Sequence, residues 1–254
     1  MIEFILSIKA RNETLFYFGA INLFLAILFL VLSKTTTIEV SGVNAWYKPL
    51  KFSLSIFIYS CTMAWYCYYL PSFNINLFNW SIIALFGFEI IYIAFQAAKG
   101  EMSHYNSSTP VYSFLFSMMA FAASAATIYT AYIGVLFFKN HFPELPEYYV
   151  WAIRLGIVLF VIFSFQGFLM GSRLSHTVGS ADGAVGIPIL GWSTHYGDLR
   201  IAHFVGMHAL QVLPLLSFYL LKNTKAVVLV SLLYALLAVY TLVLSLQGRS
   251  LVSV

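Results

Sequence analysis

The residues of this sequence best suited to chemistry are histidines and a few polar side chains that interrupt long apolar stretches. The segment from Arg200 to Gln211 reads Arg-x-x-His-x-x-x-Met-His-x-x-Gln. Helical residues turn by about 100° each, so on a helix these polar residues occupy an arc of about 140°. Asp198, just before the segment, is suited to cap the first helical turn. Because a polar face of this kind cannot lie against lipid, we expect it to line a site.

A second set of polar residues lies in an earlier apolar stretch. Glu89, Gln96 and Ser103 are spaced by seven residues and therefore share one helix face, and His104 follows directly. At 1.5 Å per residue, Glu89 lies about 14 Å below the membrane face at which its stretch ends. His208 lies about 12 Å below the face at which its own stretch begins. Both depths are counted from the same predicted face, so we expect the two sets to converge.

This convergence predicts one polar site that opens on a single membrane face. The predicted catalytic residues are Glu89, His208, Asp198 and Arg200. The predicted cofactor-binding residues are His104, His203, His208, Lys48, Lys51, Gln96, Gln166 and Gln211. The predicted metal ligands among them are His104, His203 and His208.

The histidines favour redox chemistry. Imidazole is a common axial ligand of haem, and together with carboxylates it suits iron, copper or zinc. His203 and His208 diverge by about 140° around a helix, so a shared ion would need a partner from elsewhere, such as His104. The chain has no Cys-x-x-Cys-His motif for covalent haem. The pattern therefore favours a membrane oxidoreductase that binds haem b or a transition metal.

Membrane lipid is the expected surrounding of this site, with a quinone or another small molecule as partner or substrate. Two alternatives stay open. In a proton-coupled small-molecule transporter, Glu89 would be a protonatable relay, although no inverted repeat is visible. In a membrane-embedded lipid-modifying enzyme, Asp198, His203 or His208 would act as acid or base, although His-Glu-x-x-His and Gly-x-Ser-x-Gly motifs are absent.

The composition of the chain indicates that the segments which position these residues lie in a membrane. Of the 254 residues, 61% are hydrophobic, 18% aromatic and only 9% charged, whereas about 25% of the residues in a soluble domain are charged. A soluble domain and a disordered chain are therefore excluded. The 13 basic residues are spread thinly between apolar blocks, which excludes a nucleic-acid partner. Cys61 and Cys67 lie on different faces of one stretch, so a disulfide framework is also excluded.

Long apolar helices must position the site. A bilayer core about 30 Å thick needs about 20 mostly apolar residues per helix. Seven stretches meet this requirement: Thr14–Ser33, Leu50–Leu70, Leu77–Ala98, Val111–Phe138, Tyr149–Gly171, Ile201–Leu221 and Ala226–Leu246. We therefore predict an all-α polytopic membrane protein, a seven-transmembrane-helix bundle that forms a single domain over residues 1–254. A bacterial-type inner membrane or a plasma membrane is its expected location.

Two segments outside these stretches carry further predictions. Residues 1–12 mix apolar and charged side chains, and we expect them to form a short interfacial helix. Residues 171–200 form a long Gly- and Ser-rich loop between predicted helices five and six, which we expect to be functional and to cap the site. Its apolar patch Val185–Trp192 favours folding back onto the membrane surface. With seven spans the termini lie on opposite faces, named A (N-terminal) and B, and the site opens on face B.

Overall fold

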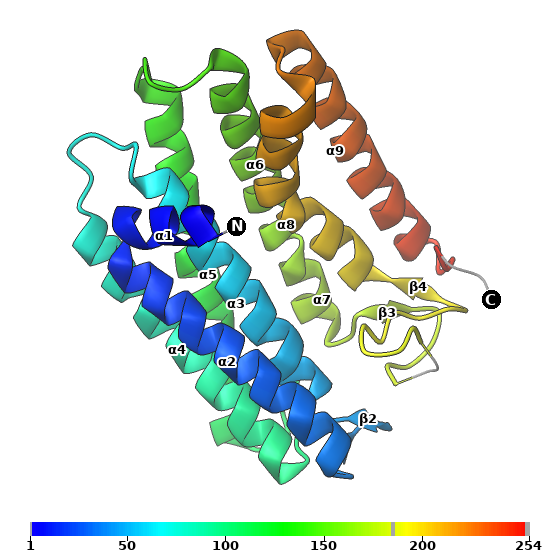
Figure 1. Cartoon of the computed structure of the whole chain (residues 1–254). Coiled ribbons are helices and arrows are strands. Elements are labelled where there is room, and N and C mark those ends of the chain that lie inside the picture. Colours follow the sequence, from blue (N-terminus) through cyan, green and yellow to red (C-terminus); the bar gives the residue numbers. More distant parts are fainter. Residues whose placement is uncertain (1, 184–185, 252–254) are drawn as a thin grey trace. The chain divides into compact units, whose positions relative to one another are not determined.

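The computed structural model describes residues 2–183 and 186–251. Helices make up most of the described chain, and two short two-stranded antiparallel sheets complete it (Figure 1). The predicted all-α class is confirmed. By its internal contacts the chain forms two compact units, Met1–Ala126 and Thr127–Val254. The single domain over the whole chain stays a prediction.

The helices and strands follow one another in the order shown in Figure 1. The first unit contains α1 (Ile2–Arg11), α2 (Glu13–Thr35), β1 (Glu39–Val40), β2 (Val43–Asn44), α3 (Tyr47–Cys67) and α4 (Ile75–Lys99). Helix α5 (Pro110–Lys139) runs through the boundary between the units. The second unit continues with α6 (Glu147–Phe165), α7 (Gly167–Arg173), β3 (Thr177–Val178), β4 (Gly197–Asp198), α8 (Leu199–Leu216), the π-helix η1 (Ser217–Leu221) and α9 (Thr224–Leu246).

Long apolar helices make the chain an integral membrane protein. Among the described residues, six helical segments have the length and composition to cross a membrane: Glu13–Thr35, Ile75–Lys99, Pro110–Lys139, Glu147–Arg173, Leu199–Leu221 and Thr224–Leu246. The predicted count of seven is not confirmed, because α3 is not among the six. Lys48, Lys51 and several serines and tyrosines make α3 more polar than these segments.

The predicted loop 171–200 contains ordered elements. Helix α7 extends into it as far as Arg173, and β3 pairs with β4 directly before α8 begins. An isolated bridge joins Gly186 and Ser193. Val185, the first residue of the predicted apolar patch, lies outside the described residues. The role of this connection as a functional cap stays a prediction.

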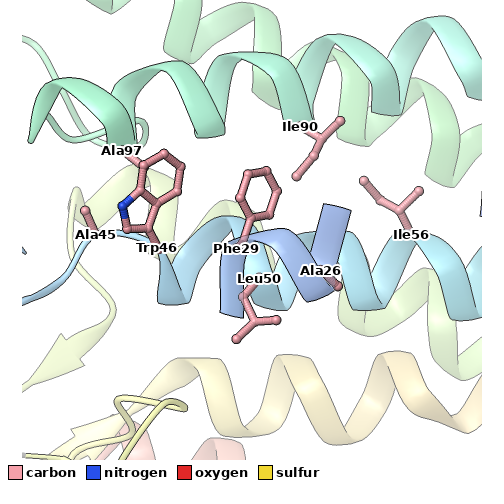
Figure 2. Packing of buried hydrophobic residues seen from close by; sticks show 8 residues of the cluster. All are labelled: Ala26, Phe29, Ala45, Trp46, Leu50, Ile56, Ile90 and Ala97. Carbon is pink, nitrogen blue, oxygen red and sulfur yellow. The ribbon is translucent and has the colours of Figure 1, made fainter. Parts of the chain in front are cut away.

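The core of the first unit lies where α2 runs along α3. Phe29 of α2 stacks on Trp46, with ring centroids 5.7 Å apart. Figure 2 shows both rings within a cluster of apolar side chains that also includes Ile90 and Ala97 of α4. At Gly19 of α2 an added Cβ would lie 3.4 Å from Cβ of Ser60. The missing side chain therefore allows the two helices to approach closely.

Polar contacts fix the short helix α1 to the same unit. The guanidinium of Arg11 lies 3.5 Å from the centroid of the Trp65 ring, a cation–π contact at the end of α3. Asn12, which caps α2, exchanges two hydrogen bonds of 2.9 Å with Asn79 of α4 through their side-chain amides. Residues 2–11 are helical as expected, and the interfacial location of α1 stays a prediction.

The core of the second unit is built on the contact between α6 and α8. Three residues of α8 at this contact are small, namely Ala202, Gly206 and Ala209. Gly206 is covered by the ring of Phe163 on α6, which would overlap any side chain at this position. A Cβ added to Gly156 of α6 would lie 2.8 Å from the carbonyl oxygen of Ala209. Small residues of this kind let helix backbones approach in a membrane, where packing drives association.

Gly206→Ala is predicted to lower the free energy of unfolding by about 1–3 kcal/mol, the usual cost of overpacking a core. The added methyl group would overlap Phe163 and push α8 away from α6. Gly87→Ala in α4 is the matched control, because nothing lies within 4 Å of its added carbon. Thermal unfolding in detergent measures both variants. Equal stability of the two variants would contradict the close contact between α6 and α8.

Candidate functional site

The start of α8 is fixed by the side chain of Asp198, which is 1% exposed. Its Oδ1 accepts from the backbone N–H of Arg200 at 3.0 Å, so the predicted cap is confirmed. The Arg200 side chain donates from Nε to Oδ1 at 2.9 Å and from Nη2 to Oδ2 at 2.6 Å. Oδ2 also accepts from the backbone N–H of Ser193 at 3.0 Å. Both carboxylate oxygens are therefore engaged in holding the connection to the start of α8.

The imidazole of His203 is held by the backbone of a neighbouring helix. Its Nδ1 lies 2.6 Å from the carbonyl oxygen of Phe163 on α6. A carbonyl oxygen can only accept a hydrogen bond, so Nδ1 carries the proton in this contact. In the neutral ring Nε2 then carries the free lone pair. A backbone carbonyl that fixes the tautomer in this way is the usual companion of a histidine that binds a metal through its other nitrogen.

The carbonyl of Phe163 lies just before an interruption in the helix. Helix α6 ends at Phe165 and α7 begins at Gly167, with Gln166 between them. A Cβ added to Gly167 would lie 3.3 Å from Cε1 of His203, so the glycine leaves room for the imidazole. Both polar side-chain atoms of Gln166 are buried, and neither has a hydrogen-bond partner among the described residues. The interruption therefore places an unsatisfied amide in the part of α6 and α7 that the imidazole of His203, on α8, contacts.

The second histidine of α8 has a different environment. Nδ1 of His208 lies 3.4 Å from Oε1 of Gln211, one turn further along the helix. Its ring forms a T-shaped contact with the ring of Phe204, with centroids 4.2 Å apart. Phe204 forms a second T-shaped contact with Trp192, with centroids 5.3 Å apart. His203 and His208 therefore have separate partners, in agreement with the divergence that the sequence predicted.

The remaining predicted site residues belong to the first unit. Glu89 is buried in α4, and no hydrogen bond or ion pair joins it to another described residue. Gln96 donates from Nε2 to the carbonyl oxygen of Met102 at 3.1 Å. His104 lies between α4 and α5, where it packs against the rings of Phe52 and Phe116. The convergence of these residues with His203 and His208 stays a prediction.

Burial controls the protonation of His104. Removal from water lowers the pKa of the His104 imidazole well below its ordinary value, and the positive charge of Lys48 lowers the pKa further. The ring is therefore neutral at physiological pH and retains one nitrogen lone pair. Its Nδ1 lies 3.3 Å from the hydroxyl oxygen of Ser103.

The described residues contain no conventional metal cluster. Within residues 2–183 and 186–251, no group of three or more His, Cys, Asp and Glu side chains is arranged to hold a metal ion. The predicted ligand set of His104, His203 and His208 has no support as a metal centre. A haem iron differs from a free ion here, because the porphyrin supplies four ligands and the protein needs to add only one or two.

The connection before α8 holds a polar cluster that the sequence did not single out. The carboxylate of Asp182 accepts from the hydroxyl of Ser175 at 2.8 Å and from the backbone N–H of Thr177 at 2.9 Å. It also forms an ion pair with Nδ1 of His176 at 3.2 Å when that ring is protonated. The sequence signal is the Ser-His-Thr run followed by an aspartate, a spacing that allows a carboxylate to bind the amides of a turn.

No protein-family model, curated protein or solved structure matches this chain. The functional interpretation therefore depends on the chemistry of the residues and on the geometry of each unit. Within the second unit, that geometry brings together the imidazole of His203, the interruption at Gln166 and the start of α8.

Asp182→Asn is predicted to loosen residues 175–182 at neutral pH but not in acid. Burial alone would raise the pKa of the Asp182 carboxyl, yet His176 and the hydrogen bonds from Thr177 and Ser175 hold the pKa below its ordinary value. The ionised carboxylate therefore stabilises the fold above the pKa of the unfolded chain. This stabilisation is lost as the pH falls through the lower pKa of the folded state.

Hydrogen exchange of the backbone amides of His176 and Thr177 tests this prediction. The quantity compared at each pH is the exchange rate in the variant divided by the exchange rate in the wild type. The ratio should exceed one at neutral pH and approach one only when the pH falls below the lowered pKa of the folded Asp182 carboxyl, where the wild-type group is also neutral. Glu144→Gln, at an exposed acidic residue of another connection, should leave the ratio at one throughout. A ratio that does not change with pH would contradict the role of the carboxylate charge.

Proposed function

We propose that this multi-pass membrane protein is a redox protein in which the imidazole of His203 would hold a b-type haem. The hydrogen bond from His203 Nδ1–H to the carbonyl oxygen of Phe163 carries the proposal. It fixes the ring orientation and leaves Nε2 as the nitrogen that would bind iron. We also propose a bacterial-type inner membrane or a plasma membrane as the location.

The rest of the second unit fits such a ligand. His203 lies four residues after the start of α8, about 6 Å along the helix axis, so the site would be near one membrane face. A haem iron there would accept or donate one electron, with a quinone or another small molecule as partner. The chain itself orients the imidazole through Phe163, and Gly167 leaves room for the ring beside α7.

The visible absorption spectrum of the purified full-length protein tests the proposal. The protein is produced with haem precursors, purified in detergent, and measured oxidised and after reduction. We expect a Soret band that sharpens and shifts on reduction, and His203→Ala should lower the haem content about tenfold or more because the iron loses its ligand. His203→Gly should regain haem when imidazole is added.

His141→Ala is the matched control, because His141 is an exposed histidine in the connection between α5 and α6. Its haem content should equal that of the wild type. A wild-type protein without a Soret band would refute the proposal, and so would an unchanged haem content in His203→Ala.

A proton-coupled transporter is the second candidate. The interruption between α6 and α7 favours it, because transporters use discontinuous membrane helices with unsatisfied polar groups to bind substrates. Gln166 supplies such a group. In transporters these interruptions lie near the middle of the bilayer, whereas Gln166 lies 19 residues after the start of α6, about 28 Å along the axis. Because Gln166 lies near one membrane face, we rank the transporter below the haem-binding redox protein.

We further propose that α3 is a seventh membrane crossing. Trp46, directly before the first turn of α3, stacks on Phe29 in the last two turns of α2. Trp65 in the last turn of α3 meets Arg11, which ends α1 two residues before α2 begins, so this turn lies near the opposite end of α2. Since α2 is long enough to cross the membrane, an antiparallel helix that follows it from end to end also crosses. Its 21 residues correspond to about 31 Å, which matches the hydrocarbon thickness.

Cysteine labelling tests this topology. The exposed residues Ser41 and Ser72 precede and follow α3, and each is replaced by cysteine in a protein whose Cys61 and Cys67 are serine. We expect a membrane-impermeant maleimide to reach Ser41→Cys and Ser72→Cys from opposite faces of sealed vesicles. Lys9→Cys should react from the same face as Ser72→Cys. Labelling of both serine positions from one face would refute the seventh crossing.

A further inference from the structure

Glu89 is a buried carboxyl group that the proposed haem site does not use. Its side chain lies on the buried face of α4 and the residue is 6% exposed. Among the described residues, no hydrogen bond or ion pair involves its carboxyl oxygens, although basic residues stand at the ends of the same helices. An unpaired carboxylate in hydrocarbon costs several kcal/mol, and the group escapes this cost by binding a proton. The neutral acid is therefore the stable form of Glu89.

Two further polar side chains follow Glu89 on the same face of α4. Tyr92 and Gln96 lie three and seven residues later, within an arc of about 60° and about 4.5 and 10.5 Å along the axis. Both residues are buried. The hydroxyl of Tyr92 and Oε1 of Gln96 have no hydrogen-bond partner among the described residues. Three side chains, each with a polar atom that lacks a partner among the described residues, therefore follow one another toward the end of the helix at Lys99.

Water is the natural partner for such a row. A buried polar atom without a protein partner is normally satisfied by ordered water. One water molecule that forms two hydrogen bonds of about 2.8 Å can join polar atoms about 5.5 Å apart. The rise along α4 is about 4.5 Å from Glu89 to Tyr92 and about 6 Å on to Gln96, so neighbouring members of the row are about one helical turn apart.

The outer end of the row reaches the surface of the unit. Nε2 of Gln96 donates to the carbonyl oxygen of Met102, a residue that is 43% exposed. Lys99 donates to the hydroxyl of Tyr112 on α5 at 3.0 Å, and Glu101 follows in the exposed connection. A proton in bulk water can therefore approach the row through charged and hydroxyl groups.

The other helices packed on α4 bring few charged groups near Glu89. Tyr59 of α3 meets Phe86 with ring centroids 5.1 Å apart, one turn before Glu89. The remaining titratable residues of α2 and α3 near the Lys99 end are Lys34, Tyr47, Lys48 and Lys51, and those near the opposite end are Glu13, Tyr17, Cys61, Tyr66 and Cys67. Among the described residues, none of them forms an ion pair with the carboxyl of Glu89, and the row leads from this carboxyl toward water at the Lys99 end.

We propose that Glu89 is a proton-exchange site whose row of Tyr92, Gln96 and bridging water connects it to water at the Lys99 end of α4. In uptake, a hydronium ion at the surface becomes water, a proton is passed along the row, and an O–H bond forms on the Glu89 carboxylate. Release reverses these steps, and no electron is transferred. This inference goes beyond haem binding and does not depend on it.

Infrared spectroscopy of the full-length protein in lipid nanodiscs tests the site itself. We expect the wild type at neutral pH to show the C=O stretching band of a protonated carboxyl. The band should be lost in Glu89→Gln and kept in Glu101→Gln, the matched acidic control in the exposed connection. Glu89→Asp keeps a carboxyl group at the site and should show the band at a shifted frequency. This variant distinguishes loss of the carboxyl group in Glu89→Gln from failure of the chain to fold. A wild type without a Glu89-dependent band would overturn the proposal.

The route is tested by the rate at which this band shifts after transfer into D₂O. Tyr92→Phe and Gln96→Leu should each slow the shift about tenfold, because each removes one hydrogen-bonding step. Ser81→Ala is the control, since its hydroxyl is on the exposed side of α4 and donates to the carbonyl of Leu77. Exchange as fast in the Tyr92→Phe, Gln96→Leu double variant as in the wild type would overturn the route. Loss of haem with an unchanged band would refute only the haem proposal.

Discussion

Hydrocarbon offers no hydrogen bonds, so every polar atom that enters it must find a partner inside the protein. This constraint accounts for the most specific contacts of the chain. The carbonyl oxygen of Phe163, located near the end of α6, accepts a hydrogen bond from Nδ1–H of His203. The carboxylate of Asp198 is buried but receives four hydrogen bonds from the connection and from Arg200. Where no partner is found, as at Gln166, the structure marks a place where water or a ligand would supply one.

The close packing of α6 and α8 makes the His203 contact possible. Gly206 and Gly156 remove the side chains that would otherwise keep the two backbones apart. The short separation then brings an imidazole on one helix within reach of a main-chain oxygen on the other. Small residues thus act on the candidate site indirectly, because they set the distance across which its polar atoms meet.

The sequence predicts features that depend on local chemistry. The long apolar stretches identified a membrane protein, and Asp198 was identified as a cap because an aspartate directly preceded an amphipathic segment. Contacts between distant parts of the chain could not be predicted. The partner of His203 is a backbone oxygen 40 residues away, and a carbonyl carries no signature in the amino-acid pattern. The count of spans also depended on packing, since α3 is polar enough to be ambiguous until its contacts along α2 are known.

The paired amides of Asn12 and Asn79 have a consequence for covalent modification. Asn12, Asn79 and Asn106 each begin an Asn-x-Ser/Thr triplet, the acceptor sequence for N-linked glycans. All three are buried, at 5%, 2% and 2% exposure, and each side-chain amide nitrogen donates a hydrogen bond. A transferase needs that nitrogen free and accessible, so the folded chain conceals every one of these acceptors. Attachment of a sugar at any of them would therefore report a chain that was modified before it folded.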